Sequence, residues 1–245
     1  MVEGLFAAAA GMAAQQDSLN AISNDIANAN TDGYQAERVG FRDLLYTPAG
    51  TPSGASVATG SGAAASQIGT SQVQGPMDPT GNKLDLALNG PGFFEVRQSD
   101  GSIGLTRNGA LTLDNRGQLT AADGSVVQPP ITVPSAVSQS DITVTSNGTV
   151  RAAGRTLGRL AIVTVPAPDQ LTPSGNTTYT PNAATGALRA VTGTTVQQGA
   201  LEGSNVNVND EMTQMISAEN GYSLDSEAIK MQQQMMQTAD QVKTA

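Results

Sequence analysis

The side chains that could carry chemistry in this 245-residue chain are carboxylates, hydroxyls and a few Lys and Arg, because the sequence contains no Cys and no His. Without a thiolate there is no disulfide, no thiol nucleophile and no Cys-ligated zinc. Without an imidazole there is no Ser-His triad and no His metal ligand. The composition therefore argues against an enzyme before any motif is considered.

Three motifs could still have a chemical role, and each has a simpler explanation. Residues 75–83 (GPMDPTGNK) lack the glycine spacing and the hydroxyl residue of a phosphate-binding loop. The oxygen-rich run 205–211 lacks the spacing and the glycine of a calcium loop, and helix capping explains it. Asp225 and Glu227 lie on different faces of a predicted helix, which excludes a carboxylate pair. We predict no catalytic residue, no metal site and no cofactor.

The chain is acidic and poor in charge. Twelve basic and 21 acidic residues give a net charge of −9, and charged residues make up 13% of the chain. The basic cluster at Arg151, Arg155 and Arg159 is too small for the phosphate contacts of a nucleic acid. A polar, uncharged surface instead suits a protein that packs among copies of itself.

Neither a membrane span nor a cleavable signal is indicated. No segment is apolar for 18 residues, which a transmembrane helix requires. The chain begins Met1-Val2-Glu3-Gly4, with an acidic residue where a signal peptide has a basic one. The sequence leaves two routes open: the protein stays in the cytoplasm, or it is exported without a cleavable signal.

Residues 5–29 form the first of two predicted helices. Two rows of residues with seven-residue spacing, three residues apart, are apolar at seven of their eight positions. The rows are Leu5, Met12, Leu19 and Ile26, and Ala8, Gln15, Ile22 and Ala29. This pattern predicts a coiled-coil seam about 40 Å long. The turn-forming residues from Asn28 onward are expected to end the helix, with Gly33 as its left-handed cap.

The second predicted helix lies near the C-terminus. Asn209 is the expected N-cap, and Asp210 and Glu211 place negative charge in the first turn, where the helix dipole favours it. One row with seven-residue spacing is Val208, Met215, Tyr222, Ile229 and Met236. Gly221 weakens this helix by about 1 kcal/mol relative to alanine.

Both helices need a partner, because isolated helices of this length are marginally stable in water. They can pair within one monomer, or they can also pack against helices of other copies. The methionines favour the second arrangement, since Met adapts to non-identical neighbours. The residues expected in the helical core are Leu5, Met12, Leu19, Ile22, Ile26, Met215, Tyr222, Ile229 and Met236.

Between the helices lie a low-complexity segment and a β-like region. The segment from Thr47 to Pro76 has no charged residue and cannot build a core, so it is a flexible linker or becomes ordered against a neighbour. From Leu84 to Thr195, Asn-Gly and Asp-Gly turns predict short antiparallel strands. Ile142, Val144 and Val150 are expected in one hairpin, and residues 157–165 in a central strand.

The expected fold class is α+β, with terminal α-helices forming a coiled-coil domain and a mainly antiparallel β domain. The predicted helical domain combines residues 1–36 and 205–245. Residues 37–76 form an extended polar segment, and residues 77–204 a β-rich outer domain.

Four sequence blocks resemble signatures of the flagellar rod and hook protein family. They are NDIANANTDGY at 24–34, GFFEV at 92–96, TRNG at 106–109 and QGALEGSNVN at 198–207. The signature residues are Asn24, Ala27, Asn28, Thr31, Gly33, Tyr34, Ser204, Asn205, Val206 and Asn207. The chain departs from the family pattern at Asp25, where Asn is usual, at Ile26, where Leu is usual, and in the helix at 220–223.

Within that family, Phe41 to Tyr46 followed by a polar stretch resembles the distal-rod subunits. Proximal-rod subunits are the alternative, and the hook protein is much longer. From a different class, a secreted surface-binding module is a further alternative, but it would be expected to have a signal peptide, a ligand pocket or terminal repeats.

The resemblance implies a structural subunit, not an enzyme. It would assemble helically into the axial drive shaft that transmits torque across the periplasm to the hook, and so serve motility. The implied partners are copies of itself, adjacent rod and hook subunits, surrounding ring proteins and the export apparatus, with neither nucleic acid nor membrane insertion. Location in the basal body after type III export, with no cleaved signal peptide, would explain the N-terminal sequence.

Overall fold

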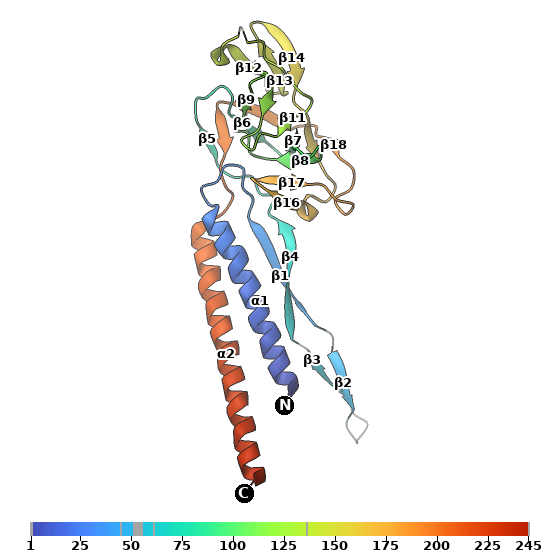
Figure 1. The fold of residues 1–245 in the computed structure, drawn as a ribbon, viewed down its shortest axis with the longest axis vertical. Helices are drawn as coiled ribbons and strands as arrows, with labels where there is room; N and C mark the ends of the chain where they lie inside the picture. The colour runs from blue at the N-terminus through green and yellow to red at the C-terminus, as the bar shows by residue number, and fades with distance from the viewer. Residues whose placement is uncertain (1, 45, 51–55, 61, 136, 245) are drawn as a thin grey trace. The chain divides into compact units, whose positions relative to one another are not determined.

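The computed structural model describes residues 2–44, 46–50, 56–60, 62–135 and 137–244 (Figure 1). The chain divides into two compact units. Unit 1 contains residues 1–27, 37–68 and 207–245, and unit 2 contains residues 28–36 and 69–206. Unit 1 therefore joins the two ends of the chain to part of the low-complexity segment.

Unit 1 is built on the two expected helices. α1 (Val2–Ala27) and α2 (Val208–Thr244) run side by side in opposite directions (Figure 1). Neither has the length and hydrophobicity that crossing a membrane requires within the described residues. The predicted terminal helices are confirmed.

Four strands complete unit 1. β1 (Glu37–Asp43) pairs with β4 (Ala63–Thr70), whose last two residues belong to unit 2. β2 (Tyr46–Gly50) and β3 (Ser56–Gly60) form an antiparallel hairpin, in register from Tyr46↔Gly60 to Gly50↔Ser56. Most of the described part of the low-complexity segment is thus paired in strands, whereas residues 71–76 are in none. Residues 51–55 and 61 lie outside the described residues.

The helix ends differ from the sequence prediction. α1 ends at Ala27, six residues before Gly33, so Gly33 is not its cap. α2 begins at Val208, and its cap lies two residues before the predicted Asn209. The cap is Asn207, whose Oδ1 accepts a hydrogen bond from the Asn209 N–H at 3.2 Å. The acidic first turn is confirmed by Asp210 and Glu211.

Unit 2 contains the expected antiparallel β structure. The main path of a nine-stranded sheet is β16 (Thr172–Gly175), β17 (Thr178–Thr180), β8 (Ile103–Thr106), β7 (Phe93–Arg97), β11 (Val126–Val127), β10 (Leu119–Thr120) and β9 (Thr112–Leu113). β15 (Ile162–Thr164) pairs with β7 and with β18 (Arg189–Ala190). The mainly antiparallel β region is confirmed.

Three smaller sheets and two short 3-10 helices complete unit 2. β12 (Ile142–Val144), β13 (Thr149–Ala152) and β14 (Arg155–Arg159) form a three-stranded sheet. β6 (Leu86–Asn89) pairs with β19 (Thr195–Gln198), and β5 (Met77–Pro79) pairs with β20 (Ala200–Glu202). The 3-10 helices are η1 (Gln139–Asp141) and η2 (Pro168–Gln170).

The central-strand prediction for residues 157–165 is wrong, whereas the neighbouring hairpin is confirmed. The run is divided between β14 in the three-stranded sheet and β15 in the nine-stranded sheet. Leu160 is buried between them, so the apolar pattern continues through a change of sheet. Val144 pairs with Val150 in the predicted β12–β13 hairpin.

Unit 2 has two apolar clusters, and successive residues of β7 enter different ones. Phe94 packs in the larger cluster with Leu86, whereas Phe93 packs with Leu105 and Tyr179. This division follows from the alternation of side chains along a strand.

Candidate assembly site

The predicted helical core residues all lie on α1 and α2, but their burial differs. Ile22 is buried, as are two residues outside the predicted set, Ala14 and Ala218. Tyr222 is exposed. The half-buried residues are Leu5, Met12, Leu19, Ile26, Met215, Ile229 and Met236. The role of these residues in assembly stays a prediction.

Three glycines in the helices face long or charged side chains of the opposite helix. A methyl group on Gly11 would come within 2.6 Å of Oδ2 of Asp225, and one on Gly4 within 3.1 Å of the Gln232 amide. On the other helix, a methyl group on Gly221 would come within 2.9 Å of Nε2 of Gln15. We call these three pairs the glycine notches. They give a physical reason for Gly221, which propensity alone marks as a weak point.

Large apolar side chains of α2 that are not in the row facing α1 are exposed to solvent. Ile216 is 60% exposed and Leu224 is 67% exposed. We define the outer stripe as Met212, Ile216, Leu224, Met231 and Met235, all exposed. Val208 is exposed as well, but it belongs to the row that faces α1. Exposed apolar surface of this extent marks an interaction site in soluble proteins.

A buried carboxylate lies near the end of α1. Asp25 is 1% exposed, and its two oxygens accept hydrogen bonds from the Glu37 N–H at 3.1 Å each. Burial raises the pKa of Glu37 and of Glu211, and repulsion from Asp25 raises both pKa values further. Repulsion from Asp210 makes a third, smaller contribution to the raised pKa of Glu211. A hydrogen bond with Asn24 acts in the opposite direction on Glu37 and lowers its pKa.

Unit 2 brings together parts of the N-terminal and C-terminal signature blocks around Asn205. Oδ1 of Asn205 accepts a hydrogen bond from the Ala36 N–H at 2.7 Å. Its Nδ2 donates to the carbonyls of Ser71 and Val73, at 3.0 and 2.7 Å. The Asn205 N–H also donates to the Tyr34 carbonyl at 3.3 Å. One amide side chain thus fixes two neighbouring segments of backbone.

Gly33 belongs to a close backbone contact in unit 2. It is buried, with φ of 69°, and its N–H donates to the Glu202 carbonyl at 2.7 Å. A side chain at this position would collide with the backbone nitrogen of Asn108. Both the left-handed backbone and the close approach therefore require glycine here.

The other signature residues have smaller local roles. Thr31 donates to Oδ1 of Asn28 at 3.2 Å, and the Val206 N–H donates to Oγ of the buried Ser204 at 3.3 Å. Ala27 is the exposed last residue of α1. None of these positions shows a catalytic arrangement; they hold turns and helix ends.

A buried ion pair connects the TRNG block to the C-terminal signature block, and sequence reasoning missed it. Nη1 of Arg107 donates to Oε2 of Glu202 at 2.9 Å, and the side chains are 2% and 3% exposed. The guanidinium lies 5.6 Å from the centre of the Phe93 ring, a cation–π distance. The available signal was the presence of Arg107 and Glu202 within the TRNG and QGALEGSNVN blocks.

Burial dominates the electrostatics of Glu202. It raises the pKa of this carboxyl, while Arg107 and the Gly75 N–H, which donates to Oε1 at 3.2 Å, oppose the rise. The Nε of Arg107 has no hydrogen-bond partner within the described residues. A buried pair of this kind stabilises a fold weakly, but removing one member leaves an unpaired charge.

The described residues of α2 therefore leave an apolar helix face exposed, and this face is the candidate assembly surface. Among the described residues, no group of three or more Asp and Glu side chains could hold a metal ion.

The comparisons with known proteins agree in their family. Residues 5–35 match the flagella basal body rod protein family, residues 87–152 the flagellar hook protein FlgE/F/G D1 domain, and residues 197–242 the flagellar basal body rod FlgEFG protein C-terminal family. The chain belongs to the flagellar basal-body rod protein family and is a structural subunit of the rod.

Relatives align with nearly the whole chain. The flagellar basal-body rod protein FlgG of Agrobacterium fabrum is 36% identical over 96% of this chain and 97% of its own length. FlgG of Buchnera aphidicola subsp. Acyrthosiphon pisum is 34% identical over 99% of this chain and 100% of its own length. A rod protein of another name, FlgF of Caulobacter vibrioides, is 33% identical over 83% of this chain. The distal-rod interpretation is favoured over its alternatives.

Proposed function

We propose that this chain polymerises helically as the distal rod, the axial shaft that transmits torque across the periplasm to the hook. The outer stripe of α2 carries the proposal, because it is apolar, exposed and extends along most of a long helix. The FlgG relatives, at 34% and 36% identity over nearly the full chain, support the distal position.

The helices would supply a contact that does not close on itself. The face of α2 toward α1 is occupied within the chain, whereas the outer stripe is free to meet a different surface of the next copy. Contacts between two different surfaces generate open helical filaments whenever the rotation from one copy to the next does not close into a ring. In the polymer, α1 and α2 would form a coiled coil together with the helices of neighbouring copies.

We assign the parts of the chain to the regions of the rod as the sequence predicts. Residues 1–36 and 205–245 would form the inner helical domain, and residues 77–204 the outer β domain. Residues 37–76 would form the extended polar segment, of which Thr47 to Pro76 would contact a neighbouring subunit and stiffen the shaft. The signature residues would keep the turns and helix ends in the conformation that assembly needs, and no catalytic role is assigned to any residue.

The partners would be further copies of the chain, adjacent rod and hook subunits, the surrounding rings and the export apparatus. The protein would reach the basal body through type III export, with no cleaved signal peptide. Export in an incompletely folded form would delay polymerisation, since the two ends of the chain pair only when both are present.

The test is a charge in the outer stripe. Ile216→Asp places a carboxylate in the middle of the stripe, and because Ile216 is already 60% exposed, the monomer is expected to keep its fold. We expect the purified variant to form no filaments by electron microscopy under conditions in which the unchanged chain polymerises, and to restore no motility in a strain that lacks its own distal-rod protein.

Ile216→Leu is the matched control, since it keeps an apolar side chain at the same position and should polymerise. Circular dichroism of both variants reports whether the helices are retained. Filaments of normal length from a folded Ile216→Asp protein would remove the outer stripe from the assembly contact.

A further inference from the structure

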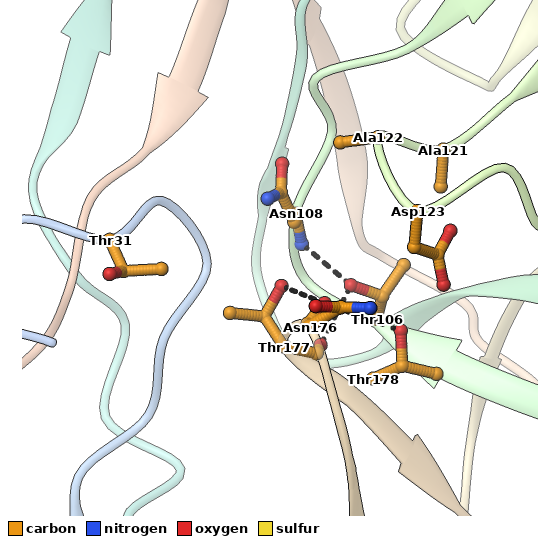
Figure 2. Close-up of a pocket in the computed structure, with 9 residues that line it drawn as sticks. All are labelled: Thr31, Thr106, Asn108, Ala121, Ala122, Asp123, Asn176, Thr177 and Thr178. Atoms are coloured by element: carbon orange, nitrogen blue, oxygen red, sulfur yellow. Dashed lines mark hydrogen bonds between the residues drawn. The ribbon is translucent and has the colours of Figure 1, made fainter. Parts of the chain in front are cut away.

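A polar furrow in unit 2 lies between two hairpin turns. One turn, residues 121–124, connects β10 and β11, and the other, Asn176 and Thr177, connects β16 and β17. Two adjoining hollows of about 300 and 220 Å³ share Asp123 and Asn176 in their walls. Figure 2 shows Asn108, Asp123 and Asn176 around the larger hollow. We call the two hollows together the polar furrow.

The walls of the furrow have hydrogen-bonding capacity that the chain does not use. The Asn176 side-chain amide and the Nδ2 of Asn108 make no hydrogen bond within the described residues, whereas Oδ1 of Asn108 accepts from the Ala110 N–H at 3.0 Å. Asp123 accepts from the N–H and the hydroxyl of Ser125, at 2.9 and 2.8 Å, and retains further lone pairs. Donors and acceptors therefore face the same space.

The backbone beside the hollow is held in a costly conformation. Asn176 and Thr177 have φ of 51° and 55°. Asn tolerates this left-handed region, but Thr is β-branched and is strongly disfavoured there. Oγ of Thr106 donates to the Thr177 carbonyl at 2.9 Å and helps to keep the turn in place (Figure 2). A two-residue hairpin turn requires positive φ at both central residues, so the turn geometry fixes where the Asn176 side chain is held beside the hollow.

The chemistry of the walls excludes several classes of ligand. The described lining contains one carboxylate and no Lys or Arg, so it does not fit a phosphate or another anion. A single carboxylate does not suffice for a divalent cation. β11 and β17 are each paired on both sides, so neither offers an open edge to which an extended peptide could add as a strand.

We propose that the polar furrow binds a neutral polyhydroxyl ligand, a linear oligosaccharide. Vicinal sugar hydroxyls donate and accept at once, which matches two free amide groups beside a carboxylate. Most of the surface of the larger hollow is apolar, and the methyl groups of Ala121 and Ala122 are part of its lining, so this hollow can receive the face of a sugar ring. Two joined hollows favour a chain of sugars over a single ring, and the absence of an aromatic side chain from the described lining implies weak binding.

The test uses the full chain as a soluble monomer and two probes, cellotetraose and the tetramer of N-acetylglucosamine. Nuclear magnetic resonance titration should show saturable shifts of the Asn108 and Asn176 side-chain amide signals for at least one probe, with a Kd of about 1–10 mM. Asp123→Ala should weaken the affinity about tenfold, because it removes a charged acceptor. Asp123→Asn should retain binding within about threefold, since an amide oxygen still accepts.

Asp114→Ala is the matched control. Asp114 also accepts a backbone N–H two residues later in a hairpin turn, from Arg116 at 2.8 Å, but it does not line the furrow, so its variant should bind like the unchanged chain. No saturable shift with either probe would overturn the proposal. An affinity of Asp123→Ala equal to that of the unchanged chain would also overturn it. Chemical shifts of the furrow residues that depend on protein concentration without sugar would overturn it as well, since they would identify a second copy as the occupant.

Discussion

Glu202 holds three separate segments of unit 2 through one residue. Its carboxylate accepts from Arg107 and from the Gly75 N–H, and its carbonyl accepts from the Gly33 N–H. Arg107 and Glu202 are 95 positions apart in the chain. A change at either residue is therefore expected to affect several signature blocks together.

Removing Arg107 should cost more than removing the whole ion pair. Arg107→Met leaves Glu202 buried and unpaired, so we expect the free energy of unfolding to fall by about 3–5 kcal/mol. The double variant with Glu202→Gln should recover much of that loss, because no buried charge remains. Urea denaturation measures the free energy of unfolding of the single and the double variant. Hydrogen exchange of residues 84–206 reports whether the loss lies in unit 2. Equal losses in the single and double variants would contradict the uncompensated charge as the cause.

Asp25 gives unit 1 a pH dependence that can be tested. Because the folded-state pKa values of Glu37 and Glu211 are raised, their contribution to stability is fully present below the unfolded pKa of about 4.3 and is lost as the pH rises through the folded values. We expect the melting temperature of the helices to fall as the pH rises from about 4 toward 7. Asp25→Asn, which restores the residue usual in the family, should reduce that slope and raise the melting temperature at neutral pH.

Asp17→Asn is the control for this pH dependence. Asp17 is an exposed carboxylate on the same helix, and replacing it removes the same net charge as Asp25→Asn. Circular dichroism melts at several pH values compare the three proteins. If Asp17→Asn flattened the profile as much as Asp25→Asn, overall charge rather than the buried carboxylate would be responsible.

At the scale of elements, the seam between α1 and α2 combines apolar residues with the glycine notches. The seam is not uniformly apolar. On α2, Asp225 and Gln232 are seven residues apart, and they lie over Gly11 and Gly4 of α1, which are also seven residues apart. The polar side chains reach the opposite helix only because these positions lack a Cβ. We therefore expect substitutions at paired positions to be coupled.

The coupling is measurable in a double-mutant cycle. Gly11→Ala should destabilise the helices despite the better helix propensity of alanine, because its methyl group would lie 2.6 Å from the Asp225 carboxylate. Asp225→Ala should remove that conflict, so the double variant should be more stable than the sum of the single changes by about 0.5–3 kcal/mol. Thermal melts give the coupling energy, and an additive result would show that Asp225 moves aside freely.

At the scale of the whole molecule, the hairpin of β2 and β3 is the segment proposed to contact a neighbouring subunit. Replacing residues 48–58 with a short Gly-Ser linker should leave the melting of the helices unchanged. In the polymer it should increase bending, which electron microscopy measures as a shorter persistence length. A deletion polymer as straight as the full-length one would contradict a stiffening role for this hairpin.

The general architecture could be predicted because local patterns specify it. Seven-residue rows such as Leu5 to Ile26 indicate a helix, and Asn147-Gly148 between apolar residues indicates a hairpin. What could not be predicted depends on contacts between distant residues. Gly33 was expected to end a helix from its residue type alone, whereas its conformation serves a contact with Glu202 and Asn108. The Arg107–Glu202 pair has no local signature.

The glycine notches also predict how this protein and its relatives can change in evolution. Asp225 occupies space that a Cβ at position 11 would need, so a change at either position alters what the other can hold. Across related chains, a larger residue at the position of Gly11 should occur with a smaller one at the position of Asp225, and the same covariation should link Gly4 with Gln232 and Gln15 with Gly221. The seam would then be inherited as matched pairs of positions.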